Sequence, residues 1–131
     1  MDRDTALEAV VEEVSVEVRQ LWERVSQPGQ SLAEAEQQVW ETFLRVAGRV
    51  LESGLAARGR GYEGARRVCS CGGQQRFVGH RPKRVQTLLG VVGVSRAYYR
   101  CGGCGQTAYP LHGELGFARG GFSEGVVRAV S

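Results

Sequence analysis

The sequence contains no apolar run long enough to cross a membrane. A membrane-spanning helix needs about 20 consecutive apolar residues, and the longest apolar runs here are a handful of residues. The acidic start, Met1–Asp4, is not followed by the apolar segment of a secretory signal. We therefore expect a cytoplasmic protein with no membrane partner, in which cysteines stay reduced.

Acidic residues are scarce in the second part of the chain. Residues 58–131 carry three Glu against eleven Arg and one Lys, a net charge of +9, whereas residues 1–57 carry eleven Asp and Glu against five Arg, a net charge of −6. No Asp follows Asp4, and only Glu114 and Glu124 follow the last cysteine. The asymmetry favours an anion-binding second half; a merely solvated basic surface is the alternative.

Apolar residues of the first half recur at helical spacing. Residues 5–26 predict one helix, opened by the capping pair Thr5 and Glu8, and a second helix opens at Ser31 and ends near Gly54. The short turn Gln27–Gln30 makes the helices antiparallel. Each helix is apolar over more than one face, so the helical hairpin, residues 1–56, should pack on the basic half or self-associate with another copy.

Four cysteines follow a Gly/Arg-rich linker at residues 57–67. They form two close pairs, Cys69-Ser-Cys71-Gly and Cys101-Gly-Gly-Cys104-Gly. Four thiolates complete a closed tetrahedral site for one structural Zn²⁺, and the glycines let backbone N–H groups point at the sulfurs. Disulfides, a redox pair and an iron–sulfur centre are the alternatives. Aromatic residues make up only 8% of the chain, so few large side chains are available for a core. A structural metal ion would help to stabilise such a small domain.

The segment between the cysteine pairs has the pattern of a β-hairpin. Lys83–Leu89 and Val92–Arg100 flank Gly90-Val91, which predicts a type II′ turn that sets Val85 opposite Arg96 and Arg81 opposite Arg100. Val85, Thr87, Leu89, Val92, Val94 and Tyr98 would form the buried face. With an earlier strand at Gln75–Gly79, the expectation is a three-stranded zinc ribbon over residues 68–110. The fold class is thus α+β, and residues 111–131 would begin a following segment.

Basic side chains gather at one end of the predicted hairpin. Like charges placed opposite each other on a sheet destabilise it, so such a cluster is best explained by phosphate groups that bind there. The isolated His80 and His112 show no catalytic pattern. The predicted nucleic-acid-binding residues are His80, Arg81, Lys83, Arg84, Arg96 and Arg100.

Three motifs occur in order over residues 68–131. They are K-x-V-x-T-L-L-G from Lys83, R-x-Y-Y-x-C-x-x-C-G from Arg96 and P-L-x-x-x-L-G from Pro110, after the first knuckle Cys-Ser-Cys-Gly-Gly. This series resembles the N-terminal region of Kra-type insertion-sequence transposases of bacteria. His112 stands where the family pattern has an acidic residue.

The resemblance implies a zinc ribbon that precedes an RNase H-like catalytic domain with an acidic triad. The chain stops at Ser131, within a segment that reads as the start of a helix, so we expect a truncated transposase that keeps the DNA-recognition end. It would bind the DNA of element ends and would not be an enzyme by itself. A zinc-stapled protein-interaction or assembly module is the competing hypothesis.

Overall fold

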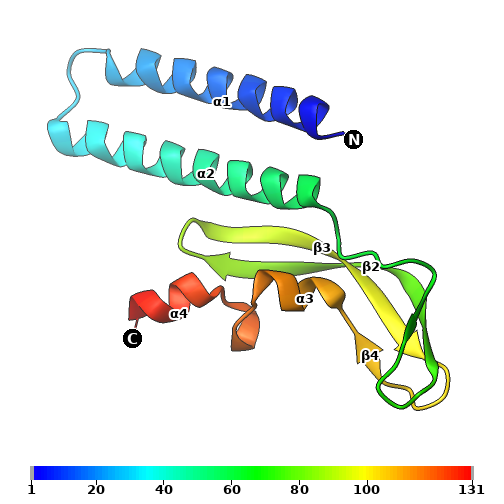
Figure 1. Cartoon of the computed structure of the whole chain (residues 1–131). Coiled ribbons are helices and arrows are strands. Elements are labelled where there is room, and N and C mark those ends of the chain that lie inside the picture. The colour runs from blue at the N-terminus through cyan, green and yellow to red at the C-terminus, as the bar shows by residue number, and fades with distance from the viewer. Residues whose placement is uncertain (1, 131) are drawn as a thin grey trace.

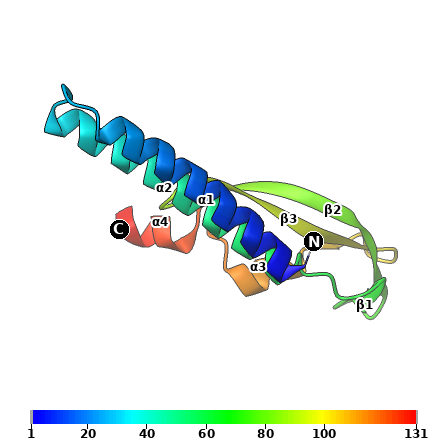
Figure 2. The ribbon, with the colours of Figure 1, turned by 90° about the horizontal axis from the view of Figure 1, so that it is seen from above.

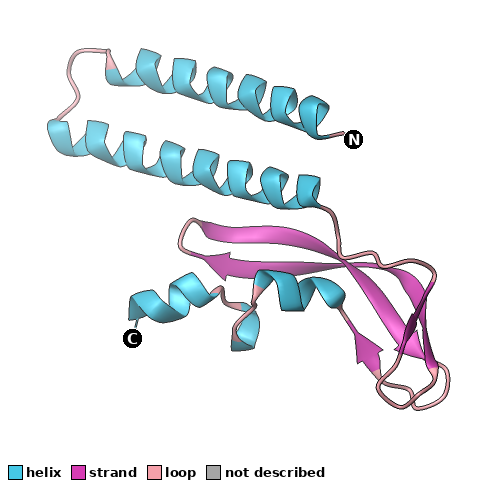
Figure 3. Ribbon diagram, in the orientation of Figure 1, coloured by secondary structure: helices cyan, strands magenta, loops and turns pink. Residues whose placement is uncertain are grey.

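A computed structural model describes residues 2–130 and shows two long helices followed by a curled antiparallel sheet and short helices (Figures 1 and 3). This confirms the α+β class. The sheet has four strands in the order β1-β2-β3-β4, one more than predicted. Among residues 2–130, no helix combines the length and apolar character that crossing a membrane requires. The elements are α1 Arg3–Val25, α2 Leu32–Arg58, β1 Arg66–Val68, β2 Gln74–Thr87, β3 Gly90–Cys101, β4 Thr107–Ala108, α3 Pro110–Leu115, η1 Arg119–Gly121 and α4 Glu124–Val130.

The elements form layers in which α2 is central. Helix α1 runs antiparallel to α2, and α2 also lies along the long hairpin of β2 and β3, with α3 and α4 on the far side of that hairpin (Figures 1 and 2). The buried residues between the helices are Leu21, Thr42 and Val46. Helix α1 is therefore supported along one side only.

The helix boundaries follow from capping and from tertiary packing. Ser31 caps α2 as predicted, because its hydroxyl accepts a hydrogen bond from the Glu34 N–H at 3.1 Å. The predicted start of α1 at Thr5 is wrong, because Asp2 is the cap and accepts from the Thr5 N–H at 2.8 Å. Helix α2 continues past Gly54 to Arg58, since Leu55 packs against the sheet core.

The main core lies on one face of the β2–β3 hairpin. Val85, Val92 and Val94 are buried there, as the alternation of the sequence predicted. Helix α3 adds buried Leu111 to this cluster. Partly buried side chains complete the core from α2 and from the chain after β4: Leu51, Leu55, Leu115 and Phe117.

The predicted hairpin register is wrong, although the predicted face is right. Val85 pairs with Val92 rather than Arg96, and Arg81 pairs with Arg96 rather than Arg100. The loop is Leu88-Leu89, held by the Thr87 hydroxyl, which accepts from the Leu89 N–H at 3.1 Å and donates to the Gly90 carbonyl at 2.7 Å. Gly90 follows the loop at φ 101°, a backbone conformation that glycine adopts at little steric cost.

The segment between α2 and β1 is fastened to the base of the sheet. The fully buried Tyr99 holds it, since its hydroxyl accepts from the Glu63 N–H at 2.8 Å and donates to the Gly64 carbonyl at 2.7 Å. The Phe77 N–H also donates to the Ala65 carbonyl at 3.0 Å. The Gly/Arg-rich linker therefore packs as part of the sheet half and leads directly into β1.

The outer edge of β3 is covered by α2 and by the same linker. The Gly93 N–H donates to a carboxylate oxygen of Glu52 at 2.7 Å, and the Ala97 N–H donates to the Arg60 carbonyl at 2.8 Å. On the opposite edge of the hairpin, the Ser123 N–H donates to the Gln86 carbonyl at 2.9 Å. Both edges of the hairpin are thus engaged by backbone-directed hydrogen bonds.

Candidate metal centre and basic face

The four predicted cysteines come together at the base of the sheet. Their sulfurs lie within 4.8 Å of one another, with Cys69 and Cys104 at 3.7 Å and Cys71 and Cys101 at 3.6 Å. Four sulfurs around one zinc ion at about 2.3 Å would be about 3.8 Å apart, so the arrangement fits a tetrahedral metal ion. The two short pairs, 29 residues apart in sequence, meet because β2 and β3 run antiparallel and set Gln75 beside Cys101.

Backbone N–H groups are directed at the sulfurs, as the glycines of the motif predicted. The Gly73 N–H donates to Cys71 Sγ at 3.4 Å, and the Gly103 N–H donates to Cys101 Sγ at 3.4 Å. A Cβ at Gly73 would lie 3.3 Å from Cys71 Sγ and 3.4 Å from Cys101 Sγ, so the glycine leaves the room that the cluster needs. Such donors stabilise thiolate charge, which a metal ligand requires.

The thiols of the cluster do not ionise alike. The backbone N–H of Cys71 lowers the pKa of the Cys69 thiol to about 6. At Cys104 the backbone N–H of Gln106 acts in the same direction, but the neighbouring thiols and burial outweigh it and raise the pKa to about 11. A cation bound to the four sulfurs would displace their thiol protons. The site offers four sulfur ligands, which suits a closed structural centre.

A row of three arginines crosses the sheet next to the cysteine cluster. Arg66 of β1 pairs with Arg76 of β2, and Arg76 pairs with Arg100 of β3, so their side chains lie on one face. Arg76 and Arg100 line a hollow together with Gly102 and Gly103 of the second cysteine knuckle. Among residues 2–130, no carboxylate forms an ion pair with any arginine of the row. Of the three, Arg100 was among the six residues predicted to bind nucleic acid, and Arg66 and Arg76 were not, because β1 and the true register were not predicted.

Arg81 lies further along the same face. It pairs with Arg96, and residues 96, 98 and 100 of β3 alternate onto one side, so Arg81 shares the face of the arginine row. Its guanidinium lies 3.9 Å from the centre of the Tyr98 ring, a cation–π contact that holds the charge in place while the residue stays exposed.

Arg96 is buried and is therefore not part of an exposed face. Only 9% of it is accessible. Its guanidinium packs on the Tyr109 ring at 3.9 Å and donates to the carbonyls of Arg81 and Pro82 at 3.4 Å each. It also lies 2.9 Å from Nε2 of His112. These contacts give Arg96 a role in packing α3 against the hairpin.

The other predicted contact residues divide between the two faces of the hairpin. His80 pairs with Ala97 and Arg84 pairs with Gly93, so both lie on the side opposite Arg81 and Arg100. Lys83 is partly buried and lies 5.8 Å from the Phe117 ring. The six residues are thus not one patch, and the compact unpaired group consists of Arg66, Arg76, Arg81 and Arg100.

His112 occupies the centre of an aromatic stack. It stacks on Tyr109 with ring centres 4.9 Å apart and meets Phe117 edge-on at 4.8 Å. Because a guanidinium only donates, His112 accepts at Nε2 and carries its proton on Nδ1. Burial, and after it the charges of Arg96 and Lys83, lower the pKa of His112.

Together the fold and the cluster define an α+β protein with a helical hairpin and a four-cysteine site able to hold a metal ion. Comparisons with protein-family models, with curated proteins and with solved structures find no match to this chain.

Proposed function

We propose that the chain is a non-catalytic DNA-binding protein whose sheet half is stapled by one structural zinc ion on Cys69, Cys71, Cys101 and Cys104. The observation that carries the DNA part is the row Arg66–Arg76–Arg100, three cations on adjacent strands with no carboxylate ion pair in the described chain. Like charges in direct register weaken a sheet. A polyanion that lies across the strands removes that repulsion and gains charge-assisted hydrogen bonds.

The chemistry of the row favours a nucleic-acid backbone as the anion. Arginine presents a fork of N–H donors that matches phosphate oxygens, and several adjacent guanidinium groups can follow successive phosphates. The resemblance of residues 68–131 to Kra-type transposases supports insertion-sequence ends as the DNA in question. Phosphate contacts position a protein without reading sequence, so the row itself accounts for affinity rather than for specificity.

The test is duplex-DNA binding as a function of salt. Each phosphate contact contributes about 0.9 to the slope of log affinity against log salt, so Arg76→Ala with Arg100→Ala should lower the slope by about two and weaken binding to all sequences alike. The matched control is Arg45→Ala with Arg49→Ala, which removes the same charge from ion-paired arginines of α2. The proposal fails if the sheet variant keeps the parent slope, or if both variants lose affinity equally.

An assembly module is the second candidate function, and one observation favours it. The helical hairpin exposes many large apolar side chains, among them Trp22, Trp40 and Leu32. This surface lies away from the sheet, so association there and DNA binding at the arginine row do not exclude each other.

A further inference from the structure

We propose that the apolar face of the helical hairpin binds the same face of a second copy of the chain, which forms a four-helix bundle with the two copies related by a two-fold axis. This inference concerns α1 and α2 and does not depend on what the sheet half binds. The helical hairpin has two long faces. One carries ion-paired side chains, and the other carries exposed apolar side chains.

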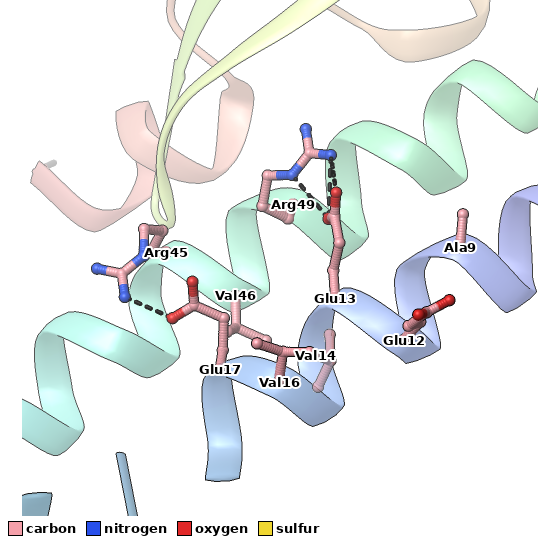
Figure 4. Close-up of a pocket in the computed structure, with 9 residues that line it drawn as sticks. All are labelled: Ala9, Glu12, Glu13, Val14, Val16, Glu17, Arg45, Val46 and Arg49. Atoms are coloured by element: carbon pink, nitrogen blue, oxygen red, sulfur yellow. Dashed lines mark hydrogen bonds and ion pairs between the residues drawn. The ribbon is translucent and has the colours of Figure 1, made fainter. Parts of the chain in front are cut away.

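One long face of the hairpin is closed by ion pairs. Glu17 pairs with Arg45 at 2.6 Å and Glu13 pairs with Arg49 at 3.1 Å, each bridging α1 and α2 (Figure 4). Val16 lies beside them on α1. The charged side chains of this side thus pair with each other across the two helices.

The opposite long face is apolar on both helices. At 100° per residue, the side of α1 away from Glu13 and Glu17 carries Leu7, Val11, Val18 and Trp22, all exposed. The corresponding side of α2 carries exposed Leu32, Val39, Trp40, Phe43 and Val50. The two stripes are continuous, because Leu7 and Val50 line one hollow at the open end of the hairpin.

The area of this face matches what a stable dimer buries. Trp22 is 66% exposed and Trp40 is 64% exposed. With full aromatic areas of about 150–250 Å² and smaller aliphatic ones, the nine side chains expose on the order of 800 Å² per chain, which equals the share of one partner in a standard interface. A typical monomer exposes no apolar patch beyond about 300–600 Å².

Side-chain size differs between the two ends of the face. Trp22, Trp40 and Phe43 are exposed near the turn that joins the helices, where Trp40 and Phe43 line one hollow. Ser53, Gly54 and Ala57 line a second hollow at the open end, beside charged residues of both helices. A two-fold axis across the middle of the helices sets the large end of one copy against the small end of the other. This is the isologous arrangement that closes after two copies.

Charges along the rim agree with the same axis. Glu8 and Arg19 lie along the outer edge of the face on α1, about three turns apart. An antiparallel pairing of α1 with α1 of the second copy sets Glu8 beside Arg19 of that copy, twice per dimer. Rim pairs of this kind fix orientation, while the apolar face supplies the affinity.

The experiment compares two valines of equal exposure on the same helix. Val11 and Val16 are each 49% exposed, Val11 on the apolar face and Val16 on the charged face. In sedimentation equilibrium of the full chain, the parent should dimerise. Val11→Glu should raise the dimer dissociation constant at least about 100-fold, because two carboxylates would be buried. Val16→Glu should leave it unchanged, and both substitutions keep the helix propensity of α1, because glutamate is a better helix former than valine.

Gly54→Phe tests the orientation. The site has open space for a side chain in the single chain, so the variant should fold and should weaken the dimer by filling the hollow. A parent that stays monomeric at all concentrations, or Val11→Glu and Val16→Glu proteins that dimerise equally, overturns the proposal. A dimer lost in Val11→Glu but unchanged in Gly54→Phe overturns the antiparallel arrangement.

Discussion

The helical half and the sheet half reach stability by opposite means. The helices expose most of their large apolar residues and bury little between them, chiefly Leu21, Thr42 and Val46. The sheet half has a compact core around Val92 and Leu111 and gathers four thiols, two of them buried, at its base. A row of arginines without ion pairs in the described chain lies beside them. The comparison teaches that the sheet half combines a buried apolar core with a cysteine cluster, whereas the helical half leaves most of its large apolar side chains uncovered.

Removal of the metal should give the largest difference between the two halves, because it should unfold the base of the sheet and leave the helices folded. Apparent zinc-binding free energies of about 10–16 kcal/mol in small zinc modules are as large as the whole net stability of a typical domain, about 5–15 kcal/mol. Cys101→Ser should therefore lose about one equivalent of zinc per chain and unfold the sheet base, while circular dichroism still reports the helices. Ser70→Ala, between two ligands and bonded to Gln106, should keep the metal. Iron with visible charge-transfer absorption in the pure protein would contradict the zinc assignment.

Loss of the Tyr99 hydroxyl should have the next largest effect. This group makes two hydrogen bonds in a fully buried place, to Glu63 and Gly64. Tyr99→Phe leaves both backbone groups without that partner and should lower the free energy of unfolding by about 1–3 kcal/mol in urea titrations. Tyr62→Phe, at an exposed tyrosine of the same segment, serves as control. Equal stability of the two variants would show that the linker is not held by Tyr99.

The stability of the protein should also depend on pH through His112, and this effect should be smaller. Because its folded pKa lies below the ordinary value of 6.5, the unfolded chain binds a proton more readily than the native protein. The contribution of His112 is therefore complete above about pH 6.5 and is lost as pH falls toward the folded pKa. The urea midpoint should decrease across this window in the parent and less in His112→Gln. A midpoint that rises on acidification would contradict the assigned neutral state.

The sequence predicted the parts of the fold that local chemistry decides. The capping serine Ser31 and the helical periodicity defined the hairpin, and the alternation around Val85 and Val92 defined the buried face. The cysteine spacing predicted the cluster, since each short pair presents two sulfurs from one turn. These signals lie within a few residues of one another, so tertiary packing does not override them.

The register of the β2–β3 hairpin and the burial of Arg96 could not be predicted from the sequence, for physical reasons. The hairpin loop depends on the Thr87 side chain, which holds Leu88-Leu89 and moves Gly90 out of the loop. The register shifts at Phe77 and Gly79, which sets Arg76 opposite Arg100. Arg96 looked like a surface cation, but the rings and carbonyls that bury it come from distant positions, above all Tyr109. Such long-range partners leave no local pattern.

The hydrogen bond from the Gly93 N–H to Glu52 bears on whether the protein aggregates while it folds. An unprotected edge strand is a template on which other chains can add strands and aggregate. Glu52 occupies that edge with a charged group, and its carboxylate accepts the Gly93 N–H that an added strand would otherwise use. The same contact is made only when α2 is folded against the sheet. The helical half therefore prevents other chains from adding a strand to the edge of β3. A chain cut between the halves would be prone to form intermolecular sheets.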